Sequence, residues 1–219
     1  MKILKQNKLD AAVKALQKGQ TIVFPTETSY GIGCDATNQS AVDKIYKIKG
    51  RTSDKPLLVV APTVAMAKKY LVWNNTIESL ANQFWPGPLT IIGKVKSLKS
   101  KVKSLSVGVV ATDGTIAIRV TAFPALQKLA EKLSHPIVAT SANLSGAGDV
   151  YSAAEAIKMF AEQKNQPDII LDYGELPHRP PSTIVRVVGG PSTRAAGTAQ
   201  YGASKLKIIR QGELIIDNI

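Results

Sequence analysis

The 219-residue sequence lacks most features of a secreted or membrane protein. It contains one cysteine, Cys34, so an internal disulfide is excluded and a reducing compartment is favoured. No apolar run approaches the roughly 18 residues of a membrane span, and no apolar core follows the N-terminal lysines. With only two histidines, His135 and His178, a structural zinc site is not expected. These absences indicate a cytoplasmic protein that makes no membrane contact.

Acidic residues and nucleotide-binding glycine motifs are also scarce. Lys and Arg number 28 against 16 for Asp and Glu, which gives a net charge of +12. This balance favours anionic partners such as nucleotides or RNA, although a solvated lysine surface explains it equally well. The sequence has neither G-x-x-x-x-G-K-[ST] nor a G-x-G-x-x-G after a strand. Any nucleotide site must therefore use scattered cations and backbone amides.

Short apolar runs alternate with amphipathic segments along the whole chain. Periodicity predicts helices over 7–19, 38–50, 63–72, 75–84, 123–134 and 152–163. Strands are predicted over 20–24, 56–61, 115–120, 136–140, 168–172, 182–188 and 205–212, with another after the "WPGP" turn. Some strands follow each other without a helix between them. The pattern predicts one α/β domain over 1–219 with a twisted mixed sheet flanked by helices.

Two segments have the composition of loops. Residues 97–107 are rich in lysine and serine, and their apolar residues are too sparse for a helix. Residues 189–204 are rich in Gly, Ala, Ser and Thr. We expect both segments to be flexible, and the second is a candidate lid over a nucleotide.

The stretch "FPTETSYGIG", residues 24–33, follows a short apolar strand. Turns favour Gly, Asn, Asp and Ser, whereas Thr26, Glu27 and Thr28 offer side-chain oxygens. The two hydroxyls lie on one side if the segment is extended. They can line a binding site, or they can simply satisfy amides in an ordinary strand connection.

Two further stretches combine polar or cationic groups with glycine. In "KIKGRTSDKP" the cations Lys49, Arg51 and Lys55 lie between a helix and a strand and can clamp a polyphosphate, or form a solvated basic loop. In "PIVATSANLSG" Ser141 and Asn143 follow an apolar strand, at the end where α/β sheets bind ligands, or they cap the next helix. Ser141 lacks the G-x-S-x-G context of a nucleophile.

The motifs "PTETSYG", "KGR…KPL", "WPGPLT", "SANLSG", "PST" and "RQG" occur in this order. Together they resemble the YrdC/Sua5 family of threonylcarbamoyl-adenylate synthases, from about Thr21 to Gly212. The length resembles the short, single-domain bacterial type. The resemblance implies a YrdC-like α/β fold with a basic cavity on one face of a mixed sheet.

The resemblance also implies a reaction. Family members combine L-threonine, bicarbonate or CO2, and ATP, and they release pyrophosphate and threonylcarbamoyl-AMP. A tRNA threonylcarbamoyl transferase complex then modifies adenosine-37 of tRNAs, and a weak contact with tRNA itself stays open. ATP is expected with Mg²⁺ held by phosphates and water rather than by a tight protein cage.

The matching positions imply roles for individual residues. Contacts to threonine are implied for Thr28, Arg119 and Ser182, with Arg119 expected to pair with the carboxylate. The K-x-R and S-x-N signature implies a catalytic centre of Lys49, Arg51, Ser141 and Asn143. Contacts to ATP are implied for Arg51, Lys55, Thr115, Ser141 and Arg210.

The chain departs from the family pattern at four positions. Arg186 stands where an acid is usual, Thr121 replaces a common proline, Phe123 replaces a polar residue, and Val60 occupies a place often held by histidine. Two other functions therefore stay open, namely a non-catalytic RNA-binding module and a divergent paralogue on the same fold. The first has the net charge in its favour, but the sequence lacks the interleaved aromatics that bind single strands.

Overall fold

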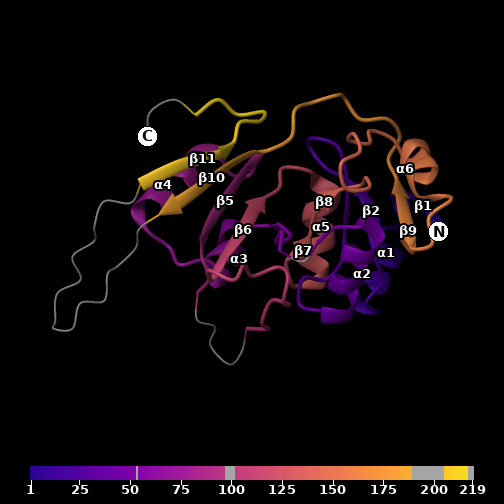
Figure 1. The fold of residues 1–219 in the computed structure, drawn as a ribbon, viewed down its shortest axis with the longest axis horizontal. Helices are drawn as coiled ribbons and strands as arrows, with labels where there is room; N and C mark the ends of the chain where they lie inside the picture. Colours follow the sequence, from indigo (N-terminus) through magenta and orange to yellow (C-terminus); the bar gives the residue numbers. More distant parts are fainter. Residues whose placement is uncertain (53, 97–101, 189–204, 217–219) are drawn as a thin grey trace.

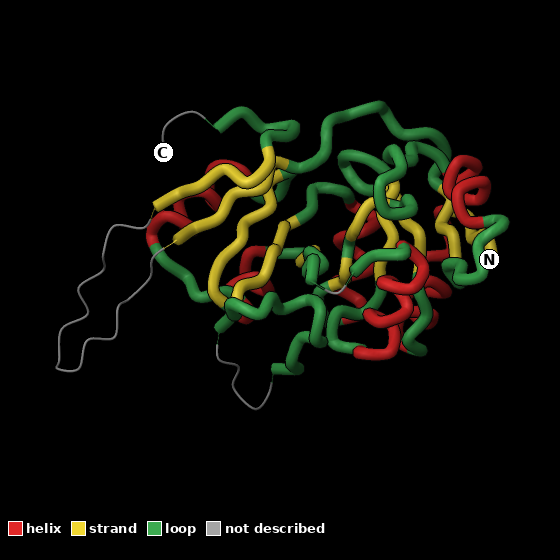
Figure 2. The backbone as a smooth tube through the Cα atoms, viewed as in Figure 1, coloured by secondary structure: helices red, strands yellow, loops and turns green. Residues whose placement is uncertain are grey.

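The computed structural model describes residues 1–52, 54–96, 102–188 and 205–216. Helices and strands interleave along these ranges, which confirms the predicted α/β class. The strands form two mixed sheets side by side, where the sequence led us to expect one (Figures 1 and 2).

The two sheets differ in size and share no strand. In spatial order the smaller contains β1 (Lys2–Lys5), β9 (Ile169–Asp172), β2 (Ile22–Pro25), β3 (Tyr30–Gly33) and β8 (Thr140–Ser141). The larger contains β11 (Lys205–Arg210), β10 (Thr183–Val188), β5 (Leu89–Lys94), β6 (Thr115–Val120), β4 (Val59–Ala61) and β7 (Ile137–Val138).

The helices divide between the sheets. With the 3-10 turn η1 (Gln6–Lys8), they are α1 (Leu9–Gln17), α2 (Gln39–Lys49), α3 (Val64–Tyr70), α4 (Asn75–Phe84), α5 (Pro124–Leu133) and α6 (Ala153–Phe160). Helices α3 and α4 accompany the larger sheet, α1, α2 and α6 lie beside the smaller one, and α5 contacts strands of both (Figure 1). Asn38, Thr63, Asn74 and Ser152 each accept a backbone N–H that the first turn of a helix leaves free.

The sheets meet at one segment, residues 137–141. Strand β7 pairs antiparallel with β4 of the larger sheet, and β8 pairs antiparallel with β3 of the smaller one. The chain thus changes sheet at Ala139. Gly33 permits this junction, because a Cβ there would lie 1.6 Å from the Val138 carbonyl oxygen.

Alternation in the larger sheet separates a core face from an open face. Ile91, Ile118 and Val185 are fully buried. They belong to a hydrophobic cluster that also includes Val23 and Ile32 of the smaller sheet. Their neighbours along the strands point to the opposite side, since strand side chains alternate. That opposite side forms one wall of a cavity.

One of the two expected loops is partly described. Residues 102–107 contain no helix or strand, but Leu105 packs against the core and the Ser106 amide donates to the Ala36 carbonyl at 2.9 Å. Residues 97–101 and 189–204 lie outside the described residues, so the flexibility of both segments and the lid stay predictions. None of the described helices is long and apolar enough to cross a membrane.

Candidate active site

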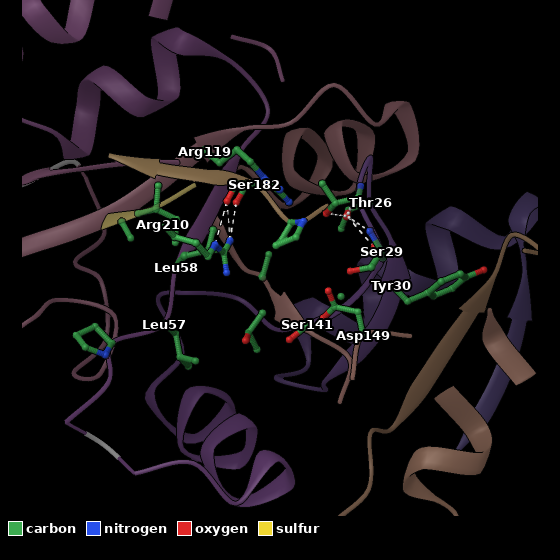
Figure 3. A pocket seen from close by; sticks show the side chains of 18 of the residues that line it. Thr26, Ser29, Tyr30, Leu57, Leu58, Arg119, Ser141, Asp149, Ser182 and Arg210 are labelled. Atoms are coloured by element: carbon green, nitrogen blue, oxygen red, sulfur yellow. Dashed lines mark hydrogen bonds between the residues drawn. The ribbon is translucent and has the colours of Figure 1, made fainter. Parts of the chain in front are cut away.

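A cavity of about 320 Å³ lies between the two sheets, at the lower end of the size range of small-molecule sites (Figure 3). Its walls come from the β2–β3 turn, the segment before α3, strands β5, β6, β10 and β11, and the junction at residues 139–141. Six predicted site residues line it: Thr28, Arg51, Arg119, Ser141, Ser182 and Arg210. These six residues come from six separate stretches of the sequence, and the fold brings them to one place.

The turn between β2 and β3 forms one wall. The Thr26 hydroxyl donates to the Ser29 carbonyl at 2.7 Å and accepts the Thr28 amide at 3.1 Å. The two threonine hydroxyls lie 3.1 Å apart because the chain turns, and not because it is extended as the sequence suggested. Thr26 therefore satisfies local backbone groups, whereas Thr28 holds its hydroxyl at the cavity wall.

Lys49 lies beneath the cavity and organises the 141–148 loop. It is 3% exposed, and its ammonium donates to the Ser141 carbonyl, the Asn143 carbonyl and Asn143 Oδ1 at 2.6, 2.8 and 3.0 Å. Asn143 Oδ1 also accepts the Ser141 hydroxyl at 2.7 Å, and its amide donates to the Ala147 and Gly148 carbonyls. Lys49 and Asn143 are therefore joined, but neither is among the lining residues described.

Burial changes the acidity of Lys49. Desolvation, with a smaller contribution from the nearby charge of Arg51, lowers the pKa of its ammonium from the ordinary 10.5 to about 8. Asp149 opposes this shift. The charged form satisfies all three acceptor oxygens, because an ammonium has three donors.

Arg51 lines the cavity and follows directly after the C-terminal end of α2. Gly50 adopts a left-handed conformation with φ 58°, which ends the helix and turns the chain toward the site. Arg51 Nε then donates to the Lys55 carbonyl at 3.0 Å, and Nη2 donates to the Pro56 carbonyl at 3.3 Å. The Lys55 side chain is exposed and is not part of the described wall. Lys55 thus orients Arg51 through its backbone.

Ser182 and Arg210 form the wall opposite the turn. Arg210 donates through Nε and Nη2 to the Ser182 carbonyl at 3.1 and 2.8 Å, and through Nη2 to the Ser182 hydroxyl at 3.2 Å (Figure 3). Thr90 lies 3.0 Å from that hydroxyl. Partial burial lowers the pKa of Arg210, with Asp149 opposing the shift.

Arg119 is the most deeply buried of the three cavity arginines. It is 4% exposed, and its side chain extends from β6 along the cavity wall (Figure 3). Its partner is Glu27, with 3.6 Å between Arg119 Nε and Glu27 Oε1. This distance exceeds that of a hydrogen bond, and neither atom has a hydrogen-bond partner in the described part of the chain.

The charge of the cavity wall is mixed. Arg51, Arg119 and Arg210 face it together with Asp149, the one carboxylate among the lining residues described. Asp149 follows the glycine-rich loop after Ser141. Asp149 was not predicted from the sequence, although an acidic residue next to this loop could have indicated it. The sequence analysis noted the side-chain oxygens of Glu27 but predicted no role for this residue.

Thr115 lies apart from the lining residues. Its hydroxyl donates to Asp113 at 2.6 Å, and Arg186 donates to the same carboxylate at 2.7 Å. These two hydrogen bonds lower the pKa of Asp113 to about 2. The basic departure at Arg186 is thus compensated by Asp113. The expected ATP contacts of Thr115 and Lys55 stay predictions.

The other departures have local partners. Thr121 is fully buried and donates its hydroxyl to Glu27 Oε2 at 2.7 Å. Phe123 contacts Tyr173 edge to face, with 5.9 Å between ring centroids. Val60 is fully buried in a hydrophobic cluster with Leu126 and Ile137. The described residues contain no group of three or more His, Cys, Asp or Glu side chains that could hold a metal ion.

Comparisons with known sequences agree with this geometry. Residues 14–197 match the sequence model of the Sua5/YciO/YrdC family, whose description reads "Telomere recombination". A threonylcarbamoyl-AMP synthase from Pseudoalteromonas translucida is 37% identical over 161 residues, which cover 72% of this chain and 83% of the relative. One from Vibrio vulnificus is 33% identical over 177 residues, covering 78% and 90%.

Solved structures show the same similarity. P. abyssi Sua5 with the H234A/Y235A changes superimposes with a TM-score of 0.77 and 28% identity over 96% of this chain. P. abyssi Sua5 complexed with L-threonine gives 0.73 and 30% over 85%. This chain spans 60% and 54% of the lengths of those two proteins. By sequence and by fold, the chain belongs to the Sua5/YciO/YrdC family.

Proposed function

We propose that this protein is an L-threonylcarbamoyladenylate synthase, which makes threonylcarbamoyl-AMP and pyrophosphate from L-threonine, bicarbonate or CO2, and ATP. The observation that carries the proposal is the convergence of Thr28, Arg51, Arg119, Ser141 and Ser182 on one cavity. The relatives named threonylcarbamoyl-AMP synthase and the threonine-bound Sua5 structure support it.

The threonine end of the cavity lies between the β2–β3 turn and β6. The guanidinium of Arg119 is buried and short of partners, so a carboxylate is the ligand it suits best. Thr28 and Ser182 offer hydroxyls to the amino acid. Selecting threonine over serine rests on one methyl group, which a fitted pocket can distinguish by about 1–3 kcal/mol.

The ATP end lies at Arg51, Ser141 and Arg210. Two guanidinium groups on this side of the wall can hold the triphosphate, and Lys49 with Asn143 fixes the loop that presents Ser141. ATP enters with Mg²⁺ as part of the substrate, and Asp149 is the wall carboxylate that can accept hydrogen bonds from the ion's water ligands. Lys55 and Thr115 contact ATP beyond the wall itself.

The chemistry joins two anions. The neutral amine of threonine attacks CO2 and loses a proton, giving a carbamate. A carbamate oxygen then attacks the α-phosphorus of ATP, the bond to the β-phosphate oxygen breaks, and pyrophosphate leaves with the electron pair. The arginines lower the repulsion between the reactants, hold them in line and stabilise charge on the phosphorus centre, so no covalent enzyme intermediate is needed.

The proposal includes the wider context of the reaction. Residues 1–219 act as one domain, because a single hydrophobic cluster joins strands of both sheets. The product is consumed by a tRNA threonylcarbamoyl transferase complex, and the net charge of +12 suits a weak contact with tRNA.

The test is pyrophosphate release with ATP, bicarbonate and each amino acid in turn. We expect more release with threonine than with any other amino acid, and loss of that release in Arg51→Ala. The control is Arg179→Ala, whose side chain is 55% exposed and whose release should equal that of the unmodified protein. Equal release with every amino acid would contradict the substrate. No release combined with steeply salt-dependent RNA binding would favour the RNA-binding module instead.

A further inference from the structure

Glu27 lies beside Arg119, the buried cation of the cavity wall. Its side chain is 13% exposed, and its Oε1 atom lies 3.6 Å from Arg119 Nε. Both atoms are buried and lack a hydrogen bond within the described ranges. A buried guanidinium without a counter-charge is costly, so the Glu27 carboxylate compensates the buried charge of Arg119.

The second oxygen of Glu27 is held firmly from another element. Glu27 Oε2 accepts the Thr121 hydroxyl at 2.7 Å. That hydroxyl accepts the Phe123 amide at 3.1 Å, and the Thr121 carbonyl accepts the Gln127 side-chain amide at 2.8 Å. Thr121 is therefore fixed at the start of α5, and Glu27 is anchored through it.

We propose that Glu27 is a positioning residue for Arg119, anchored by Thr121. Glu27 faces the Nε atom of the guanidinium, and Nη1 and Nη2 then receive the substrate carboxylate as a two-pronged pair. This inference rests on the proposed function, since it takes the carboxylate to be that of threonine.

The anchor depends on the hydroxyl of Thr121. A proline at position 121, which the family pattern commonly has, carries no hydroxyl to donate to Glu27. With threonine there, the connection between β6 and α5 reaches the carboxylate directly.

A different role would give the opposite sign. If Glu27 only competed with the substrate for the charge of Arg119, removing the carboxylate would tighten threonine binding. If Glu27 only stabilised the fold, its removal would lower the melting temperature and leave the relative affinities for threonine and ATP unchanged.

The experiment measures threonine and ATP binding by calorimetry in four variants. Glu27→Ala should weaken threonine binding about tenfold to a hundredfold through misplacement of Arg119, while ATP affinity stays within about twofold. Glu27→Gln, which keeps an acceptor oxygen, should recover part of the loss. Thr121→Val should weaken threonine binding roughly threefold to tenfold, the size of the net contribution of an ordinary hydrogen bond.

The matched control is Thr21→Val. Thr21 is also fully buried and also donates its hydroxyl to a carboxylate, that of Asp168 at 2.9 Å, but it is not among the described lining residues. This variant should lower the melting temperature and leave threonine affinity unchanged. Equal losses of threonine affinity in Thr21→Val and Thr121→Val would overturn the proposal.

A double-mutant cycle separates this inference from the proposed function. Glu27→Ala should have no further effect on threonine binding once Arg119 is Ala, and the melting-temperature losses of the two changes should fail to add. Additive losses would overturn the positioning role. If the unmodified protein bound no threonine, the proposed function would fail, and the melting cycle would still test the Glu27–Arg119 contact.

Discussion

Lys49 and Arg119 are two buried cations of the same site, 3% and 4% exposed, with opposite hydrogen-bonding states. Lys49 donates to three oxygens between 2.6 and 3.0 Å, and every one belongs to the loop that it supports. Arg119 has an ion pair with Glu27 at 3.6 Å, and its Nε atom makes no hydrogen bond among the residues described.

The difference distinguishes a scaffold residue, whose hydrogen bonds hold the shape of the site, from a receptor residue, whose unused donors can bind a ligand. A buried cation with all donors satisfied has little left to offer a ligand, and removing it leaves acceptors unpaired. A buried cation with unused donors at a cavity wall keeps its binding capacity for a substrate. We therefore propose that Lys49 shapes the site and that Arg119 binds the substrate, although the family resemblance implied a direct functional role for both cations.

The largest effect is expected at the receptor. Arg119→Ala should reduce threonine-dependent pyrophosphate release by about 10²–10³-fold, since it removes a preorganised donor for charge in a buried site. The free energy of unfolding should also fall, because the change leaves the largely buried Glu27 carboxylate without its cation. Steady-state kinetics and urea unfolding measure both. A large loss of stability with unchanged release would reverse the assigned roles.

For Lys49, the scaffold residue, the main expected effect is on the free energy of unfolding. Lys49→Met leaves the carbonyls of Ser141 and Asn143 without their donor, so the free energy of unfolding should fall by about 3 kcal/mol. Binding of threonine and ATP should weaken together, as the 141–148 loop loses its shape. Chemical denaturation with calorimetry tests this, and a selective loss of one ligand at unchanged stability would contradict it.

A smaller effect should follow pH. The pKa of Lys49 is lowered to about 8, so its ammonium loses a proton as the pH rises through 8 and then donates at most two of three hydrogen bonds. We expect ATP-dependent turnover to decline above pH 8. The unfolded chain keeps a pKa near 10.5 and binds more protons between the two values, so this group makes stability rise with pH in that window.

The Lys49→Met variant is the control for these opposite trends. It lacks the titrating group, so its turnover should show no decline of this origin above pH 8. A decline of equal size in both proteins would assign the titration to another group.

The smallest effect is expected at Asp149. Its carboxylate faces the cavity and offsets the charges of Lys49 and Arg210. Asp149→Asn should tighten metal-free ATP about fivefold, which corresponds to about 1 kcal/mol of repulsion removed across ~4 Å of water-like medium. The gain should shrink when Mg²⁺ is added. Calorimetry with and without Mg²⁺ compares the ATP affinities of the variant and the unmodified protein. Weaker metal-free ATP binding by the variant would contradict the expectation.

Local patterns were sufficient to predict the helices and most strands, although β1 and β3 were not predicted. Apolar periodicity and cap residues indicated α2 and α4, and alternation indicated β6 and β10, because these signals are set by residues close in sequence. The division into two sheets was not predictable in this way. This division depends on Ala139, where the chain passes from β7 in one sheet to β8 in the other, and on the space left by Gly33.

The site was predictable as a set of residues but not as a set of roles. The family resemblance identified Thr28, Arg51, Arg119, Ser141, Ser182 and Arg210, which the structure brings to one cavity. Whether a hydroxyl or cation is satisfied by the protein depends on distant partners, such as Ser182 for Arg210 and Thr121 for Glu27. Sequence spacing contains no information about those partners.

The most direct test of the receptor role of Arg119 compares L-threonine with L-threoninamide, which lacks the carboxylate. Calorimetric titration of the unmodified protein should give affinity for threonine at least about tenfold above that for the amide, as expected for a charge-assisted pair. In Arg119→Ala this ratio should fall to about one. The same ratio in both proteins would contradict the account, because the carboxylate would then be bound elsewhere.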